Sequence, residues 1–429
     1  LSLHDALPIL AEQFAAEQTP DVDRAARRLI YVLDKEEPVL FEDERIAFTR
    51  TVTTIPEIFT EAEMEELRKE HWIHEKGDVC NISVDYTKLL NQGFDAKKAE
   101  LEVLRQQFSQ AGEAAKAHNI KLQIDILDHV LALAARYQEL AEKKGNDVVA
   151  RTLKAVPAHA PQSFLEALSM FRIIHFTMWC GRNYHNTVGR FDQYIYPYLK
   201  ADLDKGLYTE ESALELLEEF FLTFNRDSDL YPGMQQGDNG QSLVLGGLNE
   251  DGSDSYNLLS ELCLKASLEL KVIDPKINLR VHEKTPLGTY ILGTQLTKQG
   301  LGFPQYSNDD VVIPGLMELG YEKEDAYRYV VAACWEFIIP GAAMDIPNIE
   351  ALSFTKAVSD AAMEKLEQCR SYDEFEKAVR DKINAQADEL CKRVNGVYLY
   401  PAPFLSLMMD GCCENGTDVS LGCQYNNYG

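Results

Sequence analysis

The sequence predicts an α/β fold, either a barrel or a sheet covered by helices. Helical patterns fill the chain up to about residue 230, short β-type runs bounded by Gly, Asp and Pro come next, and helical segments separate and succeed those runs. Strands that alternate with helices are typical of such folds. The 429 residues exceed what one small core needs, and a hydrophobic content of 45% is typical of a globular protein. No repeat or linker indicates an internal domain boundary.

The helices of the first half are predicted from caps and apolar patterns. Ser163 and Glu166 predict a capping box before a helix from Phe164 to Cys180, which is apolar nearly all round and is therefore expected in the core. Thr209 is expected to begin an amphipathic helix whose apolar stripe ends near Phe224.

Beyond residue 230 the pattern changes repeatedly. Residues 242–247 and 271–282 are expected to be β-strands, and Pro314 is expected in the first turn of a short helix. Residues 322–331 look helical, and residues 333–348 are expected to form a loop because they contain Pro and Gly and have no helical period. Helical segments are predicted again for residues 351–394, followed by a turn at residues 401–403.

Charge and hydropathy exclude several classes of function. The chain has 42 Lys plus Arg against 69 Asp plus Glu, a net charge of −27, which disfavours nucleic-acid and membrane-surface binding. No stretch of eighteen apolar residues is present, and residues 1–10 have no basic segment typical of a secretory signal and no clear relation to the rest of the chain. Nine scattered cysteines without a Cys-x-x-Cys pair favour reduced thiols and a cytosolic protein. Phosphate-binding glycine loops and zinc-ligand spacings are absent from the sequence.

One short motif combines two groups with useful chemistry. Cys334 and Glu336 lie two residues apart, so an extended loop would turn both side chains toward one cavity. Sulfur can abstract a hydrogen atom, and the carboxylate can take a proton from the same substrate. A cysteine hydrolase that pairs Cys334 with His185 is an alternative, although no local signature supports it.

The context of this motif resembles the pyruvate formate-lyase-like family, the glycyl radical enzymes. The matching segments are residues 189–198, 238–247, 302–314, 330–341, 401–411 and 424–429. The resemblance implies an α/β barrel of ten strands in two antiparallel five-stranded halves, surrounded by helices and incomplete at the C-terminus. Residues 1–429 are expected to form a partial domain of this type, without the glycine radical domain and its Arg-Val-x-Gly-Tyr type motif.

The resemblance also implies roles for the residues of the motif. Cys334 matches the family's thiyl residue, and Glu336 matches its general base. The glycyl radical, on a residue outside this chain, would be installed by a radical S-adenosylmethionine activase. The other expected partners are a small-molecule substrate and a second subunit in a homodimer, and no metal is expected. The adjacent Cys412 and Cys413 are interpreted as structural.

The expected reaction is a radical elimination, a dehydration or the cleavage of a C–N, C–S or C–C bond in a small polar metabolite. A decarboxylase, an acyl transferase similar to formate acetyltransferase and a catalytically silent fragment are the alternatives. We expect the 429-residue chain alone to be inactive.

The substrate site departs from the family's diol dehydratases. Those enzymes have a Gly-His-x-x-Pro-Asp-Tyr type segment where this chain has Asn81 and Val84, so glycerol or propanediol is not favoured. Asn81, His185 and Asp345 are the candidate substrate-binding residues. Trp335 and Phe337 flank the motif and are expected either to shape the site or simply to pack against the barrel wall.

Overall fold

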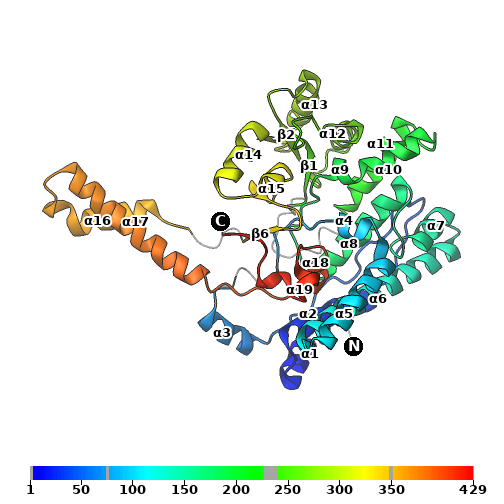
Figure 1. The fold of residues 1–429 in the computed structure, drawn as a ribbon, viewed down its shortest axis with the longest axis horizontal. Helices are drawn as coiled ribbons and strands as arrows, with labels where there is room; N and C mark the ends of the chain where they lie inside the picture. The colour runs from blue at the N-terminus through cyan, green and yellow to red at the C-terminus, as the bar shows by residue number, and fades with distance from the viewer. Residues whose placement is uncertain (1–2, 74–76, 227–239, 347–350, 429) are drawn as a thin grey trace.

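The computed structural model describes residues 3–73, 77–226, 240–346 and 351–428. Four positions or segments named above lie outside this part, namely residues 1–2, residues 238–239, residues 347–348 and Gly429. The structure is mixed α/β and mostly helical, with its strands near the centre of the molecule (Figure 1).

The first half of the described chain is helical, as predicted. Its helices are α1 (Leu3–Glu17), α2 (Asp21–Lys35), α3 (Glu61–Glu70), α4 (Thr87–Leu90), α5 (Gly93–Gln110), α6 (Ala114–Lys144), α7 (Asp147–Ala155), α8 (Phe164–Cys180), α9 (Phe191–Tyr194), α10 (Tyr196–Asp204) and α11 (Glu210–Thr223).

The α8 helix is the central helix of the core, as its apolar sequence predicts. Nearly all of its side chains are buried, and the Ser163 hydroxyl accepts a hydrogen bond from the Glu166 N–H. The predicted capping box is only half formed, because the Glu166 carboxylate accepts instead from the N–H of Gln162. At α11 the box is complete, with Ser212 as the partner of Thr209.

Three parallel strands form the main sheet, in the order β1 (Ser242–Gly246), β2 (Lys276–Val281) and β3 (Gln305–Asn308). The helices α12 (Leu258–Leu270) and α13 (Leu287–Thr297) connect them. β1 and β2 are buried on both faces, as is usual for parallel strands, whereas β3 is only partly buried. One face carries Leu243, Leu245 and Leu279 into the large core, and Val244 lies in a smaller, second core.

Further extended segments lie beside β1. A parallel bridge joins Leu243 to Gly189, a second joins Asn186 to Ile82, and an antiparallel bridge joins Ile82 to Met344. Met344 lies in β6 (Ala343–Ile346), which pairs in parallel with β7 (Tyr425–Tyr428). In the described part of the chain this row stays open at β3 and β7, so the ten-stranded barrel is not seen.

Three local predictions are wrong. The helix expected for residues 322–331 is α15 (Lys323–Tyr327) followed by β4 (Val330–Ala332), and the loop expected after it contains β5 (Glu336–Ile338) and β6. The reason is tertiary, because β4 and β5 pair with each other and pack on the second core. Pro314 lies inside α14 (Asp309–Glu318), because Asn308 caps the helix at an earlier residue than expected.

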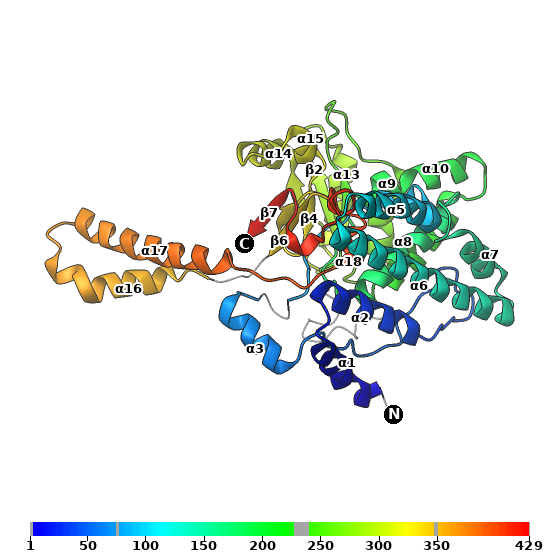
Figure 2. The ribbon, with the colours of Figure 1, turned by 60° about the horizontal axis from the view of Figure 1, so that its bottom comes forward.

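The remaining helices complete the C-terminal region. They are α16 (Phe354–Lys365), α17 (Tyr372–Val394), α18 (Pro403–Ser406), α19 (Cys412–Asn415) and the short 3-10 turns η2 (Leu366–Gln368) and η3 (Val419–Leu421). As predicted for residues 351–394, α16 and α17 are helical, and together they form an arm that extends away from the body in both views (Figures 1 and 2). Among the described residues, no helix has the length and apolarity needed to span a bilayer.

Candidate active site

The cysteine of the Cys334–Glu336 motif lies at the tip of a β-hairpin. β4 and β5 pair in antiparallel register, with Ala332 opposite Glu336, and residues 333–335 form the turn between them. Ala333 adopts a positive φ of 42°, which lets the chain reverse within three residues. The Cys334 side chain is exposed at this tip. The hairpin thus replaces the extended loop that the sequence indicates.

The Glu336 carboxylate turns back over the tip. Its Oε2 atom accepts hydrogen bonds from the backbone N–H groups of Cys334, at 2.8 Å, and of Trp335, at 2.9 Å. Bonds from N–H groups stabilise the ionised form of a carboxylate. The hairpin turn, rather than side-chain alternation, therefore brings the carboxylate close to the cysteine.

The base of the hairpin is attached to the main sheet. Val330, Val331 and Ile338 are fully buried in the second core together with Val244 of β1. The Thr187 hydroxyl lies 2.6 Å from the Ser242 carbonyl oxygen and 2.9 Å from that of Val331, so it links β1 to β4. These contacts fix the base of the hairpin, and the base determines where Cys334 lies at the tip.

A fully buried ion pair holds the segment that leads into the hairpin. Arg280 of β2 donates to both carboxylate oxygens of Asp309, at 2.9 and 2.7 Å, and it also donates to the carbonyl oxygens of Tyr327 and Tyr329. The Tyr329 hydroxyl donates to Asp309 at 2.7 Å. Tyr329 directly precedes β4, so this network fixes where the hairpin begins.

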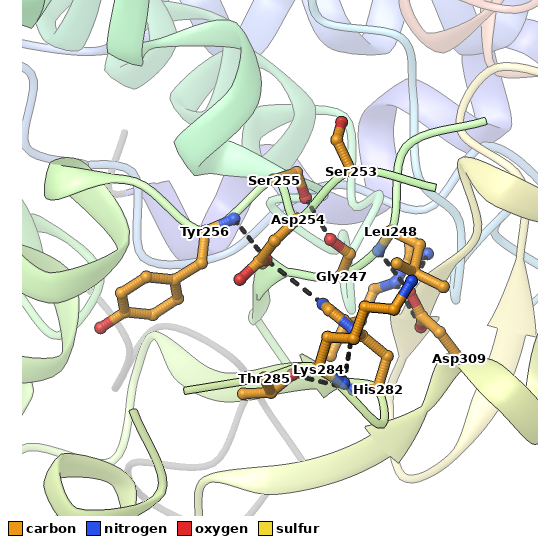
Figure 3. A network of polar contacts seen from close by, with 12 residues as sticks. Gly247, Leu248, Ser253, Asp254, Ser255, Tyr256, His282, Lys284, Thr285 and Asp309 are labelled. Atoms are coloured by element: carbon orange, nitrogen blue, oxygen red, sulfur yellow. Dashed lines mark hydrogen bonds and ion pairs between the residues drawn. The ribbon is translucent and has the colours of Figure 1, made fainter. Parts of the chain in front are cut away.

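The same network reaches the carboxyl-terminal end of the sheet, where two loops meet (Figure 3). The N–H of Leu248, just after β1, donates to Asp309 at 2.6 Å. His282, just after β2, lies 3.4 Å from Asp254. These contacts tie the loops that follow β1 and β2 to the network below the hairpin.

The three candidate substrate-binding residues lie in neighbouring segments. Asn81 and His185 directly precede the bridged residues Ile82 and Asn186, which pair in parallel. Asp345 directly follows Met344, which bridges to Ile82 in antiparallel fashion. This register places Asn81 between His185 and Asp345. Asn81 and Asp345 are buried, and the ring of the partly buried His185 packs against Gly240.

Asp345 is electrostatically coupled to the hairpin. Burial raises the pKa of Asp345 to about 7, and the nearby negative charge of Glu336 contributes to the increase. This coupling places Glu336 close to the row formed by Asn81, His185 and Asp345. Two carboxylates that share one region can hold one proton near neutral pH, which suits an acid–base step.

In the described part of the chain, several buried polar atoms of this row and of the main sheet have no hydrogen-bond partner. They include Oδ1 of Asn81 and Oδ2 of Asp345 and, on the main sheet, Oγ of Ser242 and Oδ1 of Asn278. Buried polar atoms normally have partners, so these atoms are suited to binding water or a polar ligand. Phe337 packs edge-on against Tyr329 at 5.4 Å, which agrees with a simple packing role, whereas Trp335 is half exposed.

The other singled-out side chains are core residues. Cys412 and Cys413 are buried, and burial raises the pKa of both thiols, that of Cys413 to about 11. His175 is buried in α8 and accepts a hydrogen bond from the Trp179 indole at 3.0 Å.

The sequence reasoning missed the residues that support the hairpin. Thr187 and Arg280 lie outside the matching segments, and Asp309 lies in segment 302–314 without a role of its own; their pairing depends on strands that are distant in sequence. The sequence offers one signal for such a supporting ion pair, namely a charged residue within the β-type run at residues 271–282. A charged side chain between buried neighbours needs a partner of opposite charge.

The structure combines a cysteine hairpin with an open α/β sheet covered by helices, and known proteins have a similar fold. The fold is similar to a solved structure described as "1,2-propanediol Dehydration in Roseburia inulinivorans; Structural Basis for Substrate and Enantiomer Selectivity", with a TM-score of 0.83, 22% identity, and coverage of 98% of this chain and 65% of that one. Residues 31–429 match the family described as Pyruvate formate lyase-like. The chain belongs to this family of glycyl radical enzymes, in its dehydratase and lyase branch.

The sequence identity of the chain to two curated relatives is low. The chain is 28% identical over 389 residues to a (2S)-3-sulfopropanediol dehydratase of Klebsiella oxytoca. The aligned part covers 81% of this chain and 47% of the relative. The chain is 25% identical over 392 residues to a trans-4-hydroxy-L-proline dehydratase of Clostridioides difficile, with coverage of 79% and 47%. The chain thus spans about half the length of these relatives.

Proposed function

We propose that this chain is the thiyl-bearing part of a glycyl radical lyase or dehydratase that acts on a small polar metabolite. The hydrogen bond from the Cys334 N–H to the Glu336 carboxylate carries this proposal, because it holds a base beside the thiol. Hydrogen-atom transfer and proton transfer can then act on neighbouring atoms of one substrate.

In the proposed reaction Cys334 relays a hydrogen atom. A glycyl radical on a residue outside this chain, installed by a radical S-adenosylmethionine activase, supplies the radical by taking the hydrogen atom of the Cys334 S–H bond. The Cys334 sulfur then takes a hydrogen atom from a substrate carbon, so an S–H bond forms as a C–H bond breaks. Glu336 accepts the proton of the neighbouring substrate hydroxyl or amine while the leaving group departs from the adjacent carbon with the electron pair of its bond. The resulting product radical takes the hydrogen atom back from the Cys334 S–H bond, which restores the thiyl radical.

The row formed by Asn81, His185 and Asp345 is the proposed binding site for the polar groups of the substrate. Two of these residues present buried oxygen atoms without partners, Oδ1 of Asn81 and Oδ2 of Asp345. A protonated Asp345 can donate a hydrogen bond that an ionised one cannot. In the whole enzyme we propose that a closed ten-stranded barrel encloses this row, because a carbon radical requires protection from water and oxygen.

A decarboxylase is the second candidate. The chain is 28% identical over 218 residues to a 4-hydroxyphenylacetate decarboxylase glycyl radical subunit of Clostridioides difficile. The similarities to the two dehydratases extend over far more of the chain, so elimination is the favoured reaction.

The test uses the protein expressed without oxygen from its complete gene. It is activated with a radical S-adenosylmethionine activase and supplied with small hydroxylated sulfonates, hydroxylated amino acids, diols and aryl carboxylates. We expect a glycyl doublet in electron paramagnetic resonance and an elimination product from one of these substrates. A doublet accompanied only by carbon dioxide release would favour the decarboxylase, and equal product formation by a Cys334→Ala variant would exclude a thiyl mechanism.

A further inference from the structure

A buried arginine without full pairing lies in α2. The Arg28 side chain is only 3% exposed, and its Nη2 atom donates to Asp78 and to the Gly181 carbonyl oxygen, both at 2.9 Å. Its Nε and Nη1 atoms are buried and have no hydrogen-bond partner among the described residues. A buried guanidinium normally satisfies its donors with anions or carbonyl groups, so two open donors on a buried cation leave capacity for an oxyanion.

A second buried arginine shares the same counter-ion. Arg182 lies 3.0 Å from Asp78 and 2.7 Å from Glu57, whose side chain is half exposed. Asp78 therefore serves two buried guanidinium groups, Arg28 and Arg182, and the shortage of negative charge falls on Arg28.

The positive charges of these arginines also affect the pKa of the neighbouring Tyr184 phenol. Burial raises the pKa of Tyr184, while Arg50, Arg182 and Arg28 oppose the increase. The charges of three arginines and of Asp78 thus act on this phenol.

This cluster continues the row of candidate substrate-binding residues. Asp78 lies three residues before Asn81, and Arg182 lies three residues before His185, on segments that run side by side in the same direction. The Asn183 side chain donates to the Val79 carbonyl oxygen at 3.2 Å and joins the two segments between these levels. Three residues span at most about 10 Å, which is within reach of a small metabolite together with an arginine side chain.

The hairpin contacts the same segments. Its base contacts Thr187 through the Val331 carbonyl oxygen, and its second strand, β5, lies against β6, which carries Asp345.

We propose that Arg28 and Arg182 bind the anionic group of the substrate, and that the substrate is therefore a small organic carboxylate or sulfonate. The inference rests on the function proposed above. Arg28 supplies Nε and Nη1, two open donors that point to different sides of the guanidinium group. One of them binds an oxygen atom of the anion while Arg182 adds its positive charge, and Asp78 holds both arginines in place when the site is empty.

The test measures binding of acetate and methanesulfonate to the 429-residue chain by calorimetry at constant ionic strength, with propane-1,2-diol as the neutral probe. We expect Arg28→Gln to weaken binding of one or both anions at least tenfold. Arg27→Gln, which changes the adjacent exposed arginine, should bind like the unchanged chain. Equal binding by the Arg28→Gln variant, equal loss in the Arg27→Gln variant, or binding of the diol as tight as that of both anions would overturn the inference.

A second pair of variants distinguishes loss of anion binding from loss of folding. Arg28→Lys keeps the charge but not the planar array of N–H donors, so it should fold and still bind the anion more weakly. Asp78→Asn should unfold at a lower temperature and should gain more thermal stability from the anion than the unchanged chain does, because it frees both guanidinium groups. No additional gain would show that the cluster is purely structural.

Binding and catalysis are separable in this design. Cys334→Ala should bind the anions unchanged. If the complete protein turns over only neutral substrates and no anion binds, the inference fails while the proposed function stands. If anions bind but the activated protein shows no Cys334-dependent reaction, the proposed function fails instead.

Discussion

The Oε2 atom of Glu336 lies 2.8 Å from the backbone nitrogen of Cys334 and accepts its hydrogen bond. The base and the thiol of the proposed reaction are thus held by one tight turn rather than by separate elements. The base of this hairpin is buried against Val244 of β1, so packing fixes the position from which the tip extends. The chemistry of the two residues can nevertheless be separated by substitution.

Cys334→Ala in the complete, activated protein should abolish turnover, because carbon cannot relay a hydrogen atom as sulfur does. The glycyl signal in electron paramagnetic resonance should persist. Cys391→Ala, at an exposed cysteine of α17, is the matched control and should retain activity. A rate above about one hundredth of the original, roughly 2.7 kcal/mol of barrier, would remove Cys334 from the relay.

Glu336→Gln should lower kcat by about 10²–10⁴-fold, the usual size of a general acid–base contribution, with little change in substrate affinity. The amide oxygen of glutamine can still accept both backbone hydrogen bonds of the turn, so the hairpin should be preserved. The measurement is steady-state kinetics with a separate binding assay. An unchanged kcat would favour acyl transfer over elimination.

The raised pKa of Asp345 predicts that the free energy of unfolding depends on pH. Its pKa rises from 3.8 to about 7 on folding, so the folded state holds a proton that the unfolded state has lost between these values. Its contribution to stability is complete below about pH 4 and is lost as the pH rises to about 7, with a slope of at most about 1.4 kcal/mol per pH unit.

Asp345→Asn should remove this slope, and Glu336→Gln should reduce it, because the charge of Glu336 contributes to the pKa shift. Denaturant unfolding between pH 4 and 8 measures both effects. Identical pH profiles for the Asp345→Asn variant and the unchanged chain would contradict the assignment.

Asp309→Asn should destabilise the fold by about 3–5 kcal/mol, because it leaves the buried Arg280 without its counter-ion. Asp310→Asn, which changes the exposed neighbour, should cost far less. Thermal and denaturant unfolding compare the two variants. In the complete protein Asp309→Asn should also slow the reaction, because Tyr329 would no longer be held at the start of the hairpin.

Local sequence patterns explain most of the helices and few of the strands. The α8 and α11 helices follow from apolar periodicity and N-terminal caps, which act within a few residues. Residues 330–332 resemble the end of a helix because a three-residue strand has too short a period to recognise, and only its pairing with β5 makes it extended. Pro314 shows the same limit, since the cap at Asn308 decides where α14 begins.

Residue types in a fixed order along the chain are enough to predict the mixed α/β class and the family, and to single out Cys334 and Glu336 as candidate catalytic residues. The folded structure was needed to show that these two residues share a hairpin turn, that Asn81 lies between His185 and Asp345, and that Arg28 is buried beside Asp78. Each of these contacts joins segments that are distant in sequence or depends on burial. Local propensity does not encode such contacts, and the free energy that forms them comes from packing the whole core.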